Sequence, residues 1–485
     1  MRRSSTILLL LSVFLLCACA RPFDVCSFGP WEDRPSELFP DYQEVTIPCN
    51  IAPLNFYYTA VAGSRFVTTF SAGDCSFTLK GREVVWNARK WARLLEAARG
   101  GDITVHSRWH TENVPVDFQW TIHVSDDAID PFLTYRLIEP GFEVWDDLVI
   151  EERCLENFDT RAISDYRHAR NQCMNCHIHA QGRSDLSMFY LRGEGGGAIL
   201  NLDGALRKLS LHTAELGSTV YGEIHPDGRF GVFSTNTIIP AMHSAGGTRM
   251  EVYDTKSDLC LVDFNENKMV SFPETAREDR FETFPVFSAD GNYVYYCTAE
   301  ARPLPAELAQ VRYSLVRIPF DASTGTLGGP VDTLWSAAAH GASACHPKAS
   351  PDGRWLLFTV ADYGTFPINH PECDLCLLDL QTGETLPMDV VNDDKSDTYH
   401  SWSSDAKWFV FTSKRGDGLY GKPYFCHIAE DGSLTRPFLL PQQDPHFYDK
   451  MLRSFNVPDL GNGSVGFDAA EIGRIQQDVK AEIFN

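Results

Sequence analysis

Four segments in the second half of the chain repeat one pattern, and this repetition restricts the possible folds more than any other feature. In each segment, Asp-Gly or Asp-Ala predicts a tight turn, and the aromatic and β-branched residues after it predict a strand. Internal repeats of small β-units predict a propeller. The segments are "PDGRFGVFSTN" (226–236), "ADGNYVYYCTA" (289–299), "PDGRWLLFTVA" (351–361) and "SDAKWFVFTSK" (404–414). Their turn aspartates stand 63, 62 and 53 residues apart: Asp227, Asp290, Asp352 and Asp405.

These repeats resemble the TolB-like propellers, whose repeat carries an S-P-D-G-[KR]-x-[ILV]-x-[FY] core, seen here in "SPDGRWLLF". The resemblance implies a mainly β fold of five or six blades over residues 198–460. Closure of the ring is expected to use a strand from outside the four clear repeats. Because propellers carry many different activities, the resemblance says little about function.

The N-terminus has the composition of an export signal. Arg2 and Arg3 precede an apolar run over 7–16, which is too short to span a bilayer as a mature helix. The run ends in Leu-Cys-Ala-Cys, which resembles the lipobox of bacterial lipoproteins. We therefore expect a signal peptide over 1–18, lipidation of Cys19 and a tether over 19–42, with a plain cleaved signal as the alternative. The expected location is the periplasm of a Gram-negative bacterium, anchored to the inner or outer membrane.

A small β-rich domain is expected over 43–155. In "VDFQWTIHV" strict alternation places four apolar residues on one face of a half-buried strand: Phe118, Trp120, Ile122 and Val124. A helix is expected between Asn87, which can cap it, and Gly100, which can end it. Its apolar stripe consists of Trp91, Leu94, Leu95 and Ala98. A helical tail is expected over 461–485, beginning at Asp468 and Glu471.

The segment "NQCMNCHIHAQG" (171–182) carries the chemistry, within a polar stretch over 156–197. On a helical turn two cysteines three apart share a face, and the histidine that follows can reach iron. C-x-x-C-H is the signature of covalent haem attachment. We therefore expect one covalent haem c, held by Cys173 and Cys176, with His177 as the proximal iron ligand. A redox-active disulfide or a zinc site is the alternative.

The sixth iron ligand decides between electron transfer and catalysis, because a bound Met or His gives an electron carrier and an empty position gives ligand binding. The candidates are Met188 and His243, and a propeller loop favours His243. Cys373 and Cys376 in "CDLCLLDL" lack a following histidine and read as blade cysteines. A disulfide involving Cys345, or a zinc site that adds His346 and His370, is conceivable there.

The chain as a whole resembles exported lipoproteins in which a β-rich region, a "CMNCH" segment and a TolB-like propeller follow in this order. The matching stretches include "YRLIEPGFEVW", "CMNCH", "EVYDTKSDL" and "YHSWSSDAKWFVFTSKR". That family is labelled as cytochrome c related, without an established reaction. The resemblance implies a membrane-anchored monohaem cytochrome in electron transfer or redox sensing. The alternatives are a haem enzyme acting on peroxide or a small nitrogen compound, and a haem-free scaffold that binds envelope proteins.

The net charge indicates which kinds of macromolecule can bind this protein. The formal charge of −23 repels nucleic acid and anionic lipid headgroups. The same charge favours basic surfaces on envelope redox or scaffold proteins.

Overall fold

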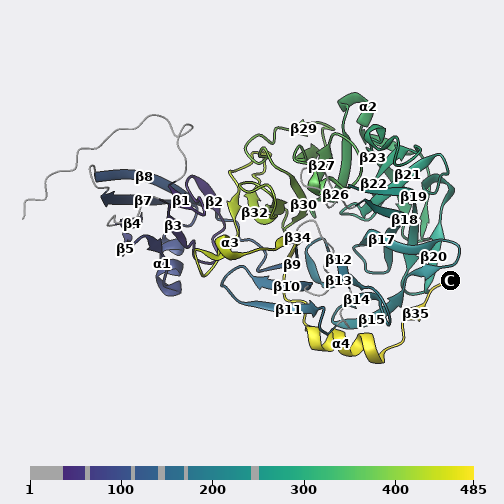
Figure 1. Ribbon diagram of the computed structural model, residues 1–485, viewed down its shortest axis with the longest axis horizontal. Coiled ribbons are helices and arrows are strands. Elements are labelled where there is room, and N and C mark those ends of the chain that lie inside the picture. The colour runs from purple at the N-terminus through teal and green to yellow at the C-terminus, as the bar shows by residue number, and fades with distance from the viewer. Residues whose placement is uncertain (1–36, 60–65, 111–114, 140–147, 169–172, 242–250) are drawn as a thin grey trace, which may run out of the picture.

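The computed structural model describes residues 37–59, 66–110, 115–139, 148–168, 173–241 and 251–485. Its elements are mainly strands, arranged as a small N-terminal unit beside a ring of sheets (Figure 1). The expected signal peptide, Cys19 and most of the tether lie outside the described residues. Within the described ranges, no helix is both long enough and apolar enough to cross a bilayer.

The N-terminal unit is a five-stranded sheet covered by one helix. The helix α1 (Ala88–Ala98) begins as predicted, because the Asn87 side chain accepts hydrogen bonds from the backbone of the first turn, and Gly100 follows it with φ of 66°. Its predicted apolar stripe is buried. The sheet pairs in the order β2 (Val45–Ile47), β8 (Pro115–Val124), β7 (Gly101–His110), β4 (Val67–Ala72) and β5 (Cys75–Lys80). A second small sheet consists of β1 (Leu38–Phe39), β3 (Phe56–Tyr58) and β6 (Glu83–Val84).

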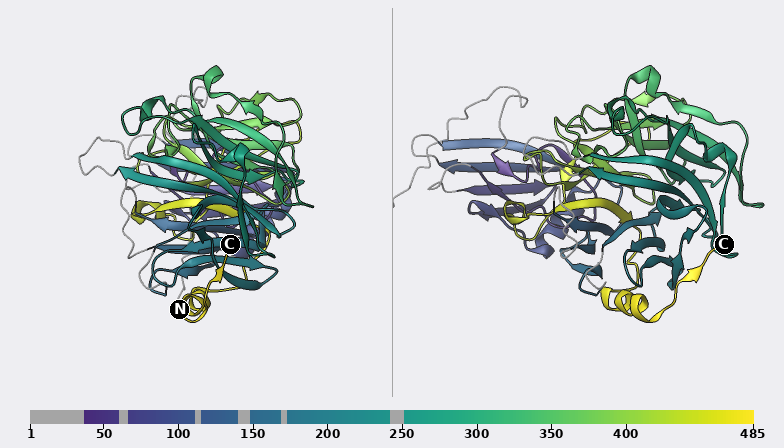
Figure 2. Two further views of the ribbon diagram at one scale, coloured as in Figure 1. Left: turned by 90° about the vertical axis from the view of Figure 1, so that its right-hand side faces the viewer. Right: turned by 45° about the vertical axis from the view of Figure 1, so that its right-hand side comes forward.

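Six further sheets of four or five strands form the ring, and each lines one central cavity, so the propeller fold is confirmed (Figures 1 and 2). In pairing order, the first three are β34 (Ser454–Gly461), β9 (Phe132–Ile138), β10 (Val149–Cys154), β11 (Thr160–Asp165); β12 (Met174–Ala180), β13 (Arg183–Leu191), β14 (Gly197–Leu202), β15 (Ala205–Ser210), β35 (Glu482–Ile483); and β16 (His212–Thr213), β17 (Gly217–Ile224), β18 (Phe230–Ala241), β19 (Glu251–Asp263), β20 (Lys268–Ser271). The other three are β21 (Arg280–Phe287), β22 (Tyr293–Glu300), β23 (Ser314–Asp321), with β24 (Thr326–Leu327) and β25 (Asp332–Trp335) both on β23; β26 (Ser343–Ala349), β27 (Trp355–Ala361), β28 (Asp374–Asp379), β29 (Thr385–Leu386); and β30 (Asp397–Trp402), β31 (Trp408–Ser413), β32 (Lys422–His427), β33 (Phe438–Leu439).

Strand β34, near the C-terminus, closes the ring. It pairs antiparallel with β9, with Ser454 opposite Ile138 and Leu460 opposite Leu133. Strands β9 and β10, expected in the N-terminal domain, therefore belong to a ring sheet together with β11 of the expected haem-binding segment (156–197). Strands β12 and β13 of that segment lie within the next ring sheet. These boundaries differ from the expected ones because strand pairing across such sequence separations leaves no local pattern.

The short helices lie around the ring. They are α2 (Ala337–His340), α3 (Phe447–Lys450) and α4 (Ala469–Asp478), with single 3-10 turns at Pro273–Thr275, Leu308–Gln310 and Pro367–Asn369. Helix α4 begins as predicted, since Asp468 accepts a hydrogen bond from the backbone of Glu471. The helix expected in the tail over 461–485 ends with α4, and the chain finishes in β35, with Val479 and Ile483 exposed.

The repeat turns are held by one hydrogen-bond pattern. In the third repeat, Ser350 Oγ donates to the Asp352 carboxylate and accepts from the backbone N–H of Trp355 at 2.9 Å. His225 replaces this serine in the first repeat, where its Nδ1 accepts from the backbone of Asp227 at 3.2 Å. The role of His225 is therefore structural.

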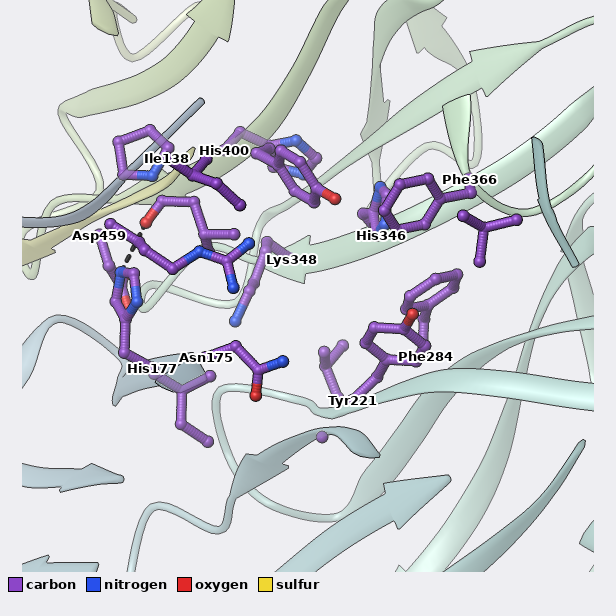
Figure 3. A pocket seen from close by; sticks show the side chains of 18 of the residues that line it. Ile138, Asn175, His177, Tyr221, Phe284, His346, Lys348, Phe366, His400 and Asp459 are labelled. Atoms are coloured by element: carbon purple, nitrogen blue, oxygen red, sulfur yellow. Dashed lines mark hydrogen bonds between the residues drawn. The ribbon is translucent and has the colours of Figure 1, made fainter. Parts of the chain in front are cut away.

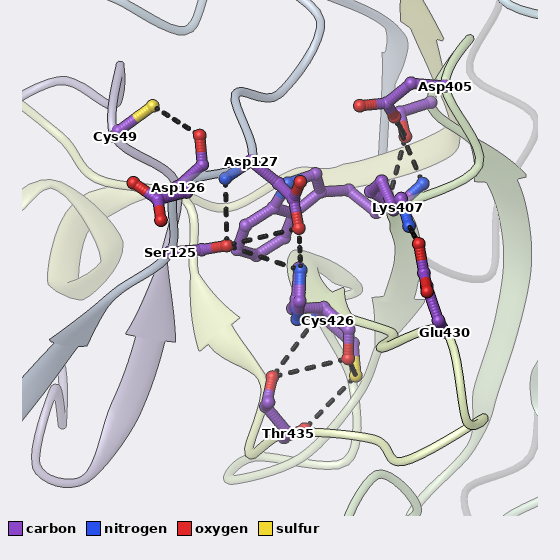
Figure 4. Close-up of polar contacts among 12 residues, drawn as sticks. Cys49, Ser125, Asp126, Asp127, Asp405, Lys407, Cys426, Glu430 and Thr435 are labelled. Atoms are coloured by element: carbon purple, nitrogen blue, oxygen red, sulfur yellow. Dashed lines mark hydrogen bonds and ion pairs between the residues drawn. The ribbon is translucent and has the colours of Figure 1, made fainter. Parts of the chain in front are cut away.

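The N-terminal unit and the β30–β33 sheet share one apolar core. Polar contacts reinforce their junction (Figure 4). Asp127 pairs with His427 Nε2 at 2.8 Å and is itself held by a hydrogen bond from its own backbone to Ser125 Oγ. Asn55 adds hydrogen bonds to the carbonyls of Gln442 and Gln443.

Candidate functional site

A cavity lined by all six ring sheets lies at the centre of the ring. Its volume is about 540 Å³, and its lining is mainly apolar. This size falls within the usual range of small-molecule and cofactor sites. Figure 3 shows its lining side chains, which come from all six ring sheets.

Each ring sheet has a β-bulge in its innermost strand, and these bulges direct side chains into the cavity. The register shifts at the same place in β12, β17, β21, β26, β30 and β34. Four of the bulge residues have a left-handed backbone, with φ between 42° and 52°: Phe284, His346, Tyr399 and Val457. A bulge redirects side chains and often lies beside functional sites. Here the bulges give the cavity a ring of inward-facing residues.

The haem motif occupies one of these bulges. Three segments occupy equivalent positions, each starting in an inner strand and ending in the turn after it. They are "NCHIHAQG" (175–182) at β12, "YGEIHPDG" (221–228) at β17 and "HPKASPDG" (346–353) at β26. The first segment is therefore a further copy of the repeat, which the sequence analysis missed. The helical turn expected for the motif is wrong, because pairing with β13 makes this stretch a strand.

Two of the three predicted haem residues line the cavity. Cys173 and His177 are both buried there, and Cys176 lies in the bulge beside His177, with its side chain outside the described part of the structure. Burial lowers the pKa of His177 to about 4, so the imidazole is neutral at pH 7. Because a carbonyl can only accept, His177 Nε2 donates its proton to Val457 O at 2.6 Å.

Two further histidines line the cavity, and the sequence analysis proposed neither as an iron ligand. Burial lowers the pKa values of His346 and His400 to about 3. His346 belongs to a continuous row of rings from four sheets. Ring centroids are 4.5 Å apart for Tyr221 and Phe284, 4.3 Å for Phe284 and His346, and 4.9 Å for His346 and Tyr399.

Charged side chains also line the cavity. Lys348 Nζ pairs with Glu223 Oε2 at 2.7 Å, and Lys348 and Asp459 line both this cavity and a smaller one beyond it. Burial raises the pKa of Glu223, although Lys348 opposes this shift. Arg136 and Arg192 add positive charge to the cavity wall.

The remaining predicted site residues lie elsewhere. Met188 on β13 is buried in an apolar core with Leu200 and Leu209, and it does not line the cavity. His243 lies outside the described residues. Cys345 and Cys373 are unbridged thiols, and the described ranges hold no cluster of three or more His, Cys, Asp or Glu residues placed to bind a metal. The conceivable zinc site therefore has no support.

Comparisons with known proteins bear on the fold alone. No protein-family model matches the chain, and no curated protein matches it. The β-propeller domain of the Trilobed protease from Pyrococcus furiosus is similar, with 11% identity over 70% of this chain and 82% of that one (TM-score 0.34). The periplasmic gluconolactonase of Pseudomonas aeruginosa is similar, with 12% identity over 67% of this chain and 98% of that one (TM-score 0.34). Propeller domains host unrelated functions, so these likenesses assign none.

Proposed function

We propose that this chain carries one c-type haem in the central cavity and moves electrons or senses redox state. Cys173 and Cys176 would hold the haem through thioether bonds, and His177 would bind the iron. The observation that supports this proposal is positional. A motif singled out from sequence alone lies at the wall of the central cavity.

The residues present fit a haem. The cavity is large and mainly apolar, and it is lined by a thiol that directly precedes β12 and by a neutral imidazole on β12. Arg136 and Arg192 in the cavity wall could pair with the propionate groups. A bound haem supplies reversible one-electron chemistry at its iron. Iron binding at His177 Nε2 would replace the hydrogen bond from this atom to Val457 O.

The proposal includes a place in the cell. The signal-like run and Cys19 support export and lipid anchoring in the periplasm, the compartment in which Gram-negative bacteria attach c-type haem. The charge of −23 favours a redox partner with a basic docking surface.

The test is expression with the chain's own signal in cells that carry the c-type maturation machinery. A pyridine haemochrome of the purified protein should show one covalent haem per chain. Cys173→Ala and Cys176→Ala should each shift the haemochrome from the two-thioether position. The matched control is Cys297→Ala, which removes a buried thiol of β22 outside the cavity and should keep the haem.

The result that refutes the proposal is wild-type protein without covalent haem in these cells. Peptide mapping would then show whether Cys173 and Cys176 form a disulfide, which would favour the scaffold alternative. A haem with a five-coordinate iron would instead favour the enzyme alternative.

A further inference from the structure

We infer that His346 is the second axial ligand of the iron. This inference rests on the proposed haem and names a residue other than the candidates Met188 and His243. It starts from the place of His346 in the ring. Neighbouring inner strands touch in the order β12, β17, β21, β26, β30, β34 and back to β12. Strand β26 is therefore three steps from β12 in either direction, so His346 and His177 enter the cavity from opposite sides (Figure 3).

The hydrogen bonds of Thr359 fix the proton on the His346 ring. Thr359 Oγ1 donates its only proton to the carbonyl of Cys345 at 3.1 Å. The contact of 3.4 Å between Thr359 Oγ1 and His346 Nδ1 therefore requires Nδ1 to carry the hydrogen. The lone pair of the neutral ring then lies on Nε2. Metal-binding histidines are oriented in this way, with the second ring nitrogen bonded to an outer group.

His346 Nε2 has no partner. The atom is shielded from solvent, and no described group hydrogen-bonds to it, although the residue lines the cavity. An unsatisfied buried polar atom costs about 1–3 kcal/mol, so a retained one requires an explanation. Phe284 and Tyr399 hold the ring on two sides, and the bulge fixes the backbone at φ of 51°. The imidazole is thus preorganised around a free lone pair.

His400 is the nearest competitor and is less suited. Its Nε2 donates to Leu357 O at 2.9 Å, so only Nδ1 is left unpaired. Nδ1 is adjacent to the side-chain attachment point, so a ligand approaching it meets the residue's own backbone. His346 instead presents the outer nitrogen of its ring.

The test compares spin states in holo-protein matured in cells. Ferric wild-type protein should be six-coordinate and low-spin by visible and electron paramagnetic resonance spectroscopy. His346→Ala should lose the low-spin signal in favour of a high-spin one, and added imidazole should restore it. His346→Met retains side-chain bulk and should stay six-coordinate with a raised reduction potential. His427→Ala removes a histidine at the domain junction and should leave the signal unchanged.

Three results would overturn the inference. They are a high-spin wild-type iron, a His346→Ala protein that stays low-spin, and loss of the low-spin signal in His400→Ala instead. The pyridine haemochrome is recorded in parallel on denatured protein, so it counts attached haem whatever the sixth ligand is. Failure of haem attachment is thereby distinguished from failure of the ligand assignment.

Discussion

The stability contributed by the buried ion pair of Lys348 and Glu223 can be tested quantitatively. We expect Lys348→Met to lower the free energy of unfolding by about 3 kcal/mol at pH 7, because removal of the lysine leaves the buried Glu223 carboxylate unpaired. At 2.7 Å and an effective dielectric constant of about 20, the attraction is about 6 kcal/mol. Desolvation of the two ions offsets most of this attraction. The exposed fractions, 26% for Lys348 and 10% for Glu223, place the loss at the lower end of the range for buried pairs.

The pH dependence of this loss has a definite sign. Burial raises the pKa of Glu223 above its ordinary 4.5, so protonation of Glu223 stabilises the folded state relative to the unfolded state. This contribution is complete at low pH and is lost as pH rises through the raised pKa. The deficit of Lys348→Met should therefore be small below about pH 4.5 and largest at alkaline pH.

The assay is urea unfolding at several pH values, with the double variant Glu223→Gln/Lys348→Met as the control. Removal of both charges should recover all but about 1 kcal/mol of the loss, because no ion is left stranded. A single variant that loses less than about 1 kcal/mol, or a double variant no more stable than the single, would refute this account of the ion pair.

Two further predictions concern the ring. Burial raises the pKa of Asp254 to about 7, so Asp254→Asn should stabilise the protein by up to about 4 kcal/mol at pH 8 and have no effect below about pH 4. Urea unfolding at the two pH values checks this, and equal effects at both would contradict it. His225→Ser restores the repeat consensus but empties a site where rings of Phe287 and Phe320 lie 4.9 and 5.5 Å away. It should cost about 2 kcal/mol in urea unfolding, and a stabilised variant would disprove the packing role.

The propeller could be predicted because its turn chemistry is local and visible. Asp-Gly, or Asp-Ala in the last case, followed by aromatic residues marks four turns, whereas the copy at Gln181-Gly182 and the one in β34 lack the aspartate and were not recognised. Closure by β34 depends on pairing with β9, which no local pattern encodes.

The candidate site was predictable only in part. Cys173 and His177 were found because their spacing is a chemical motif. His346 was missed because its significance depends on Thr359 and on the opposite strand, not on its neighbours in sequence. The expectation of a helical turn at the motif followed from its spacing alone, and pairing with β13 overrode it.

The position of β34 near the C-terminus determines the order in which the ring assembles. The ring cannot close until this strand is made, and Val457 follows His177 by 280 residues. At about 5–20 residues per second, the interval between them is roughly 15–60 s. Until β34 docks, the wall that carries His177 lacks its neighbouring strand on one side. An enzyme that reaches Cys173 through this unfinished wall would act before the last strand docks.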